Sequence, residues 1–291
     1  MNGKTVITCA VTGVLTDPAR FNVPVTPTEM ADAARQAYDQ GASVVHLHFR
    51  AQEPGMGMLP TWDVEVVGEI LSAIKAAAPD MIICMSTGVV GPDISGPAAC
   101  LEAFKPEMAA CNAGSLNYLK IRQDGSWAWP PILFDNPVEK INGFLEVMNS
   151  HGIVPEFECF DLGIVRSVGM FRRNGMFEGT AHVSFVMGVA SGMPARADLL
   201  PILVDELPED ACWQTIATGD NPKRIWEVLR RTVELGGNVR TGLEDTFYLP
   251  SGEKVYENGR LVEALADIAR ESGKEPATPS EARRMMALPE R

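Results

Sequence analysis

Two histidines separated by one residue form the sharpest chemical signal in this sequence. His46-Leu47-His48 ends a run of apolar and β-branched residues that is typical of a buried strand. Side chains at positions i and i+2 of a strand point to the same face, so both imidazoles can converge on one point. Two neutral imidazoles in this arrangement suit Zn²⁺. The alternative is that neighbouring groups hydrogen-bond both histidines and no metal binds.

A catalytic zinc ion needs a third protein ligand and one open coordination position. Glu244 and Asp245 end the last strand-like run of the chain, and we expect only one of two adjacent strand residues to point inward. A carboxylate from this position is therefore the candidate third ligand. The alternative roles for Glu244 are a cap on the following helix or a salt bridge.

Arg240 precedes Glu244 by four residues, and the strand pattern places it on the same face but deeper. Buried arginine is rarely left unpaired, and Glu156 and Glu158 of another predicted strand are the candidate partners. Such a pair could orient a neighbouring acid such as Asp245. It could equally do no more than hold strands together.

Short strand-like runs alternate with longer helical patterns along the whole chain. Eight strand–helix pairs are the number that a closed parallel barrel requires, so we predict one (β/α)8 TIM-barrel domain over residues 1–291 with an extra C-terminal helix. A doubly wound open sheet is the alternative, but residues 12–15 do not form its glycine-rich dinucleotide turn. The predicted strands are 6–12, 43–49, 81–87, 107–113, 153–160, 181–188, 212–218 and 238–245, and the predicted helices are 26–41, 62–78, 98–104, 137–151, 162–174, 197–207, 222–235 and 259–272, with a last helix from Ser280.

Polar residues collect where these strands end, which is the end of a (β/α)8 barrel that carries chemistry. Ser86, Thr87 and Gly88 lie at the end of the third strand and Asn112 near the end of the fourth, so these are candidate substrate-binding residues. His182 begins the sixth strand, at the opposite end, where we expect it to pack in the core.

Composition narrows the class of protein. The formal net charge of −13 argues against a nucleic-acid partner, because phosphate binding requires a basic face. No run of about 18 apolar residues predicts a membrane span, and the first residues lack the pattern of a signal peptide. Six scattered cysteines without C-x-x-C spacing predict reduced, buried thiols in a cytoplasmic protein.

Taken together, the motifs resemble those of the β-keto acid cleavage enzymes, whose best-known activity is 3-keto-5-aminohexanoate cleavage. Any one motif is weak, but their order and spacing over nearly the whole chain are specific. They are ITCAVTG at 7–13, GASVVHLH at 41–48, STG at 86–88, PEMA at 106–109, NAG at 112–114, PEFECFD at 155–161, MG at 187–188, GMP at 192–194 and GNVRTGLED at 237–245.

The resemblance implies a (β/α)8 barrel that forms a homotetramer and holds zinc on His46, His48 and Glu244. Members of this family convert a β-keto acid and acetyl-CoA into acetoacetate and a new acyl-CoA. Zinc would polarise the keto oxygen, and the coenzyme A thiol would take the acyl group without a side-chain nucleophile.

Further roles are implied residue by residue. Asp245 corresponds to the acid/base, supported by Arg240 and by one glutamate of the 155–161 motif, either Glu156 or Glu158. Ser86 and Gly88 would hold the substrate carboxylate.

Three positions depart from the family pattern. Many relatives carry an acidic residue where this chain has Leu15, which puts an aminated substrate in doubt and indicates an apolar or differently charged acyl tail. Ala110 replaces a frequent threonine, and residues 218–222 replace a glycine- and arginine-containing loop, so the coenzyme contacts are open. The loop 51–60 is a candidate lid, specificity loop or flexible insertion.

Two other functions fit the same residues. One is a zinc-dependent aldolase or lyase that uses no coenzyme A. The other is a non-catalytic barrel that binds a metal or a metabolite.

Overall fold

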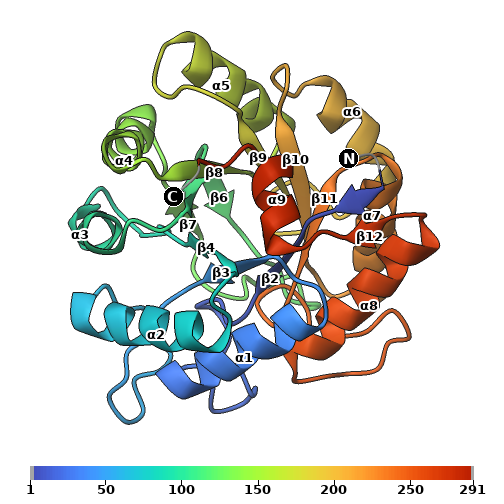
Figure 1. The fold of residues 1–291 in the computed structure, drawn as a ribbon, viewed down its shortest axis with the longest axis horizontal. Coiled ribbons are helices and arrows are strands. Elements are labelled where there is room, and N and C mark those ends of the chain that lie inside the picture. The colour runs from blue at the N-terminus through green and yellow to red at the C-terminus, as the bar shows by residue number, and fades with distance from the viewer. Residues whose placement is uncertain (1–2, 290–291) are drawn as a thin grey trace.

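The computed structural model describes residues 3–289 and contains a closed barrel of eight parallel strands (Figure 1). The hydrogen-bonded order around the barrel is β2, β3, β4, β5, β8, β9, β10 and β11, with β11 returning to pair with β2. The predicted (β/α)8 barrel is confirmed. The strands are β2 Ile7–Ala10, β3 Val44–Leu47, β4 Ile82–Met85, β5 Met108–Asn112, β8 Val154–Cys159, β9 His182–Met187, β10 Cys212–Ala217 and β11 Asn238–Thr241.

Helices follow the barrel strands and form an outer ring (Figure 1). The first begins where the sequence predicts it, because Thr26 and Glu29 form a capping box that satisfies two free backbone N–H groups. The helices are α1 Pro27–Asp39, α2 Val64–Ala77, α3 Ser95–Phe104, α4 Val138–His151, α5 Leu162–Arg173, α6 Leu200–Asp205 after the short 3₁₀ turn η1 Ala197–Leu199, α7 Pro222–Glu234 and α8 Asn258–Glu271.

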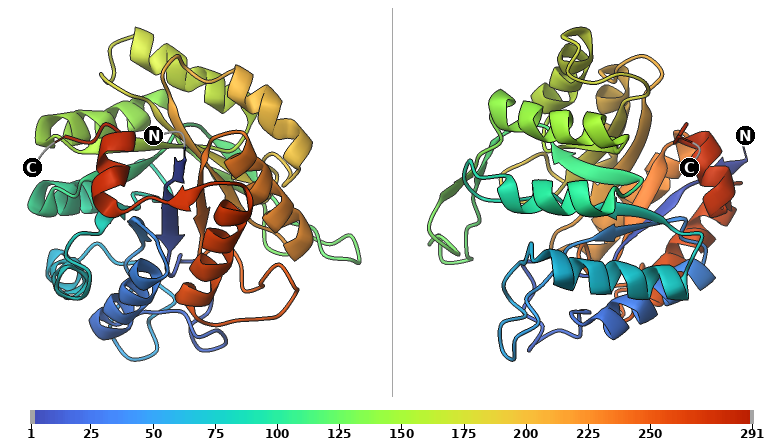
Figure 2. Two further views of the ribbon diagram at one scale, coloured as in Figure 1. Left: turned by 45° about the vertical axis from the view of Figure 1, so that its right-hand side comes forward. Right: turned by 60° about the vertical axis from the view of Figure 1, so that its left-hand side comes forward.

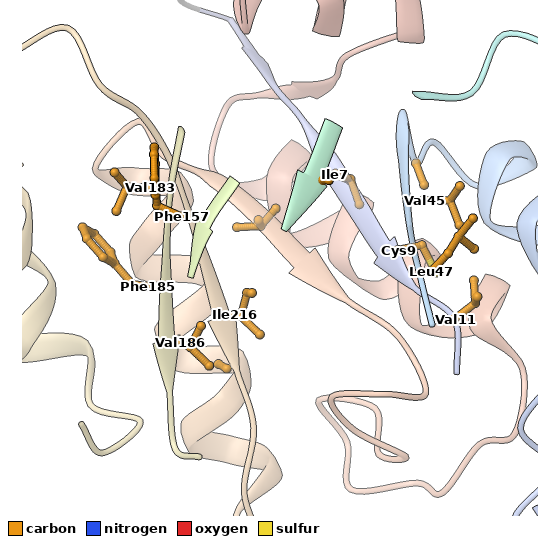
Figure 3. Close-up of a cluster of buried hydrophobic side chains, with 14 of the residues drawn as sticks. Ile7, Cys9, Val11, Val45, Leu47, Phe157, Val183, Phe185, Val186 and Ile216 are labelled. Carbon is orange, nitrogen blue, oxygen red and sulfur yellow. The ribbon is translucent and has the colours of Figure 1, made fainter. Parts of the chain in front are cut away.

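A continuous apolar layer joins the strands to the surrounding helices. Alternate side chains of each strand point away from the barrel axis and pack against the apolar faces of the helices. Figure 3 shows part of this layer, in which Ile7 and Cys9 of β2 lie near Val45 and Leu47 of β3. The remaining side chains of each strand, which alternate with these, point inward and fill the barrel interior.

The amino-terminal end of the barrel is closed by the C-terminal part of the chain. Helix α9, Pro279–Met285, lies across this end (Figure 1), and β12, Glu275–Pro276, pairs in parallel with β1, Lys4–Thr5. Val44 and Met108 of the barrel pack with Met286 in one buried apolar cluster. The predicted extra C-terminal helix is confirmed. We call α9 together with the apolar cluster of Val44, Met108 and Met286 the plug.

An antiparallel hairpin follows β5, and the sequence did not predict it. Its strands are β6 Leu116–Tyr118 and β7 Ile132–Phe134, and the segment between them projects away from the barrel (Figure 2). The hydroxyl of Ser191, which follows β9, donates to the backbone carbonyl of Asn117. Within residues 3–289, no helix has the length and apolar character needed to cross a membrane.

Candidate metal-binding active site

Polar side chains fill the middle of the barrel in layers. Thr8, Cys84, Glu156 and Gln214 come from alternate strands, β2, β4, β8 and β10, and all point inward. Glu156 accepts hydrogen bonds from the Gln214 amide at 2.7 Å, the Ser184 hydroxyl at 2.6 Å and the Cys84 thiol at 2.9 Å. Glu156 and Cys84 of this layer are buried, Gln214 is partly buried, and the layer lies one step deeper than the end of β3.

Above this layer, the predicted metal ligands come together. Nε2 of His46 lies 3.9 Å and Nε2 of His48 lies 3.4 Å from Oε1 of Glu244. Both ring nitrogens of His46 and Oε2 of Glu244 are buried and have no hydrogen-bond partner among residues 3–289. Unpartnered buried polar atoms are costly unless a ligand satisfies them, so this donor set fits a divalent metal ion.

A tight turn after β11 gives Glu244 and Asp245 their positions. The strand ends at Thr241, and Gly242 has a φ of +148°, with its Cα so close to the carbonyl oxygen of Ala10 that a Cβ would lie 2.1 Å from that oxygen. The expectation that only one of the two acids points inward is wrong, because they stand on a turn and not on a strand. Both contact Arg240.

Arg240 organises three carboxylates. Its Nε and Nη2 donate to the two oxygens of Asp245 at 3.0 and 2.9 Å, Nη2 also donates to Glu244 at 2.6 Å, and Nη1 lies 3.4 Å from Glu158. One guanidinium therefore faces three buried or nearly buried acids. The single guanidinium charge can balance only one of these acids, and a divalent cation on the histidine–glutamate cluster would offset the remaining negative charge, which is a second reason why the site fits a metal.

The protonation states favour metal binding. Burial and the charge of Arg240 hold the pKa of His46 well below its ordinary value, so the ring is neutral. Burial opposes ionisation of Glu244, but the charge of Arg240 outweighs it and keeps the pKa of Glu244 well below the usual range. Burial raises the pKa of Asp245 to about 6 and that of Glu158 to about 8. A neutral imidazole and an ionised carboxylate are the forms that coordinate zinc.

The structure distinguishes the two glutamates that the sequence left equivalent. Glu158 reaches Arg240, whereas the hydrogen bonds of Glu156 go to Cys84, Ser184 and Gln214. Glu158 is therefore the partner within the Arg240 cluster. Of the two glutamates that the sequence left as alternatives, Glu156 lies one layer deeper and makes no contact with Arg240 or Asp245 among the hydrogen bonds of residues 3–289.

The residues after β4 divide into two groups. The hydroxyl of Ser86 accepts a hydrogen bond from the Gly88 N–H at 3.4 Å, and a Cβ on Gly88 would lie 3.8 Å from both that hydroxyl and the amide of Asn112. These three residues gather at the rim. Thr87 points elsewhere, since its hydroxyl donates to the carbonyl of Ala110 at 2.6 Å and fixes β4 to β5.

Leu15 lies on the loop after β2, with 76% of its surface exposed. The same loop passes close to the metal cluster, because a Cβ on Gly13 would lie 2.8 Å from Cγ of Glu244. Leu15 therefore stands near the rim but makes no polar contribution to it.

Arg50, which no sequence motif singled out, is 1% exposed and ties two rim loops together. Its guanidinium donates to the carbonyls of Thr12, Gly13 and Gly57, at 3.2, 2.9 and 2.8 Å. The position of Arg50 two residues after His48, just beyond the end of the strand, was the one sequence feature that could have indicated a role at the rim. The contact with Gly57 ties the middle of the loop 51–60 to the loop after β2.

The fold and this cluster together define a class: a (β/α)8 barrel with a candidate active site at the carboxyl ends of its strands. The family is equally clear. The model of the beta-keto acid cleavage enzyme family matches residues 4–288, and the chain belongs to that family. The resemblance seen in the sequence motifs is confirmed.

Individual relatives agree with this assignment. The chain is 34% identical to a 3-keto-5-aminohexanoate cleavage enzyme of Acetoanaerobium sticklandii, over 98% of each chain. It is 30% identical to a 3-oxoadipate:acetyl-CoA acetyltransferase of Cupriavidus necator, over 99% of this chain and 96% of that one. Among solved structures, ObcA in a binary complex with oxaloacetate has a similar fold, with a TM-score of 0.72 and 19% identity over 91% of this chain and 67% of that chain.

Proposed function

We propose that this protein is a zinc-dependent enzyme that converts a β-keto acid and acetyl-CoA into acetoacetate and a new acyl-CoA. The observation that carries the proposal is the convergence of His46, His48 and Glu244 beside the bidentate Arg240–Asp245 pair. Relatives of similar length that are named as β-keto acid cleavage enzymes or acetyl-CoA acetyltransferases support it.

The proposed reaction exchanges one acyl group for another. The bond between the keto carbon and the carboxymethyl carbon of the substrate breaks, and the released acyl group ends on the sulfur of coenzyme A. The acetyl group of acetyl-CoA becomes joined to the carboxymethyl carbon, which gives acetoacetate. No side-chain nucleophile is required, because the thiol of coenzyme A receives the acyl group.

Each residue has a role that follows from its contacts. Zinc, when bound, would supply Lewis-acid polarisation of a carbonyl oxygen. Asp245 would move the proton, since both its oxygens are fixed by Arg240 and its pKa of about 6 leaves it mostly ionised near neutral pH. The Ser86 hydroxyl and the Gly88 N–H would hold the substrate carboxylate.

The rim also indicates the class of acyl tail. Three loops that follow neighbouring strands, those after β2, β3 and β4, each carry exposed apolar side chains, and a grouping of exposed apolar side chains can mark a ligand-binding groove. We propose that the acyl tail is apolar. The side chains are Leu15, Met56, Met58, Leu59 and Val90, with exposed fractions of 76, 44, 42, 49 and 73%.

A substrate screen tests the reaction and the tail together. Zinc-loaded protein is incubated with β-keto acids that carry alkyl, amino, carboxylate or quaternary-ammonium tails, with and without acetyl-CoA, and the products are identified by mass. We expect acetoacetate and acyl-CoA in equal amounts, only when acetyl-CoA is present, and fastest with alkyl tails. Leu15→Glu should shift the preference toward the amino tail.

Other outcomes distinguish the alternatives. Turnover without acetyl-CoA would contradict the acyl exchange and favour the aldolase or lyase. Absence of turnover across the whole panel would favour a non-catalytic barrel.

Elemental analysis tests the metal. We expect about one zinc per chain in the wild type and at least a tenfold loss of zinc affinity in Glu244→Gln, because one of three protein ligands loses its charge. Glu271→Gln, at the exposed end of α8, is the control and should bind zinc normally. Equal zinc affinity in wild type and Glu244→Gln would contradict the proposed ligand set.

A further inference from the structure

A second group of potential metal ligands lies one layer deeper than the rim cluster. A ring nitrogen of His46, Sγ of Cys84 and a carboxylate oxygen of Glu156 all lie within 4.8 Å of one another. The three residues come from β3, β4 and β8 and are 1%, 0% and 3% exposed. Their close approach is set by the barrel, since His46 and Cys84 are direct neighbours in the β3–β4 register.

No positively charged group balances the Glu156 carboxylate through a hydrogen bond within residues 3–289. Glu156 accepts hydrogen bonds from the Cys84 thiol, the Ser184 hydroxyl and the Gln214 amide, and within residues 3–289 no charged donor hydrogen-bonds to it. Both ring nitrogens of His46 lack a partner within the same range. A buried carboxylate held by neutral donors, beside an unpartnered buried imidazole, is an arrangement that a bound cation would stabilise.

The contact between Cys84 and Glu156 shows where such a cation would bind. Sγ lies 2.9 Å from Oε2, so the thiol proton lies between two atoms that can both ligate a metal. Replacement of that proton by a divalent cation leaves one thiolate and one carboxylate, whose two charges balance the ion. His46 supplies a neutral third ligand, and the proton leaves to solvent without any change of oxidation state.

We propose that His46, Cys84 and Glu156 form an inner cation site, distinct from the rim cluster, that takes a thiophilic divalent ion such as Zn²⁺ or Cd²⁺. Sulfur, nitrogen and oxygen donors together favour these ions over Mg²⁺ or Ca²⁺. Because His46 belongs to both groups, weakening the rim cluster drives an ion to the inner site. This site does not depend on the proposed acyl exchange.

Cadmium alone is the probe, since a cadmium–thiolate bond absorbs in the ultraviolet and bonds to nitrogen or oxygen do not give this band. Metal-stripped His48→Ala, which lacks one rim ligand and retains the whole inner group, is titrated with Cd²⁺. We expect a charge-transfer band that saturates at one equivalent. The band should disappear in His48→Ala/Cys84→Ser and persist in the control His48→Ala/Cys212→Ser, whose altered cysteine lies outside the group.

X-ray absorption at the zinc edge gives a second readout. We expect one sulfur neighbour at about 2.3 Å in zinc-loaded His48→Ala and none after Cys84→Ser. If the double variant with serine fails to fold, His48→Ala/Glu156→Gln replaces it, and we expect at least a tenfold weaker cadmium affinity with the thiolate band still detectable at excess Cd²⁺. A band that survives Cys84→Ser, or the absence of any sulfur neighbour in His48→Ala, overturns the proposal.

Discussion

The two ends of the barrel bury their polar and charged groups in different ways. At the carboxyl-terminal rim, Arg240 faces Glu158, Glu244 and Asp245, and buried atoms of His46 and Glu244 have no partner. At the amino-terminal end, α9 and Met286 close the barrel over an apolar cluster, and the main ion pair, Arg283–Glu107, lies toward the surface with two contacts of 2.7 Å.

The two ends therefore contribute differently to the stability of the fold. An excess of buried acidic groups at the rim is costly without a cation, whereas the plugged end adds mainly apolar burial. We therefore expect substitutions at the rim to change chemistry and metal binding, and substitutions at the plug to change stability alone. The predictions below test this separation.

The largest effect is expected for Asp245→Asn. The amide cannot take up a proton, so kcat should fall by about 10²- to 10⁴-fold, the usual contribution of a general acid or base. Zinc content should be unchanged, because Asp245 is not one of the three proposed ligands. Steady-state kinetics and elemental analysis measure both. Asp267→Asn, on the exposed face of α8, is the control. Full activity of Asp245→Asn would show that this rim carboxylate is not needed for the reaction.

Met286→Ala should cost about 2 to 3 kcal/mol of unfolding free energy, because it opens a cavity in the plug cluster. The kcat of the folded protein should be unaltered, since the residue lies at the end opposite the active site. Denaturant titration and kinetics on the same sample provide the test. Met170→Ala, which is 49% exposed on α5, should change neither quantity. A large loss of kcat in Met286→Ala would show that the two ends are coupled.

His182 links stability to pH at the plugged end. Burial lowers its pKa to about 4 from an ordinary value near 6.5. Between these two pH values the histidine is protonated in the unfolded chain and neutral in the folded protein. Stability should therefore fall as pH falls through this window, by about 2 kcal/mol between pH 7 and pH 5.

His182→Gln should lose that part of the pH dependence, measured as the difference in denaturant midpoint at pH 7 and pH 5. His151→Gln, at the end of α4, is the matched control. If His182→Gln and wild type lose equal stability on acidification, the histidine is not buried in its neutral form.

The smallest effect is expected for Arg283→Met. The ion pair with Glu107 is partly exposed, and pairs of this kind contribute about 1 kcal/mol or less. Thermal unfolding in low and high salt measures the contribution, which should shrink as salt rises. A loss as large as that of Met286→Ala would mean that charge, and not apolar burial, holds the plug in place.

Features that depend on near neighbours in the chain could be predicted from the amino-acid sequence. The alternation of strands and helices, the cap at Thr26 and the shared face of His46 and His48 all rest on residues within a few positions of one another. Because strand ends in such a barrel converge on one rim, the approximate meeting place of Glu244 with the histidines also followed.

Which side chains meet at a given depth of the barrel depends on the tertiary structure. Glu156 and Glu158 have the same strand parity, and only the stagger of the barrel separates the layer of Cys84 from that of Arg240, a residue 82 positions away from Glu158. The turn at Gly242 let two adjacent acids reach one guanidinium, which strand periodicity alone would forbid. Contacts across such distances in the chain depend on how whole elements are placed, and no local pattern encodes that placement.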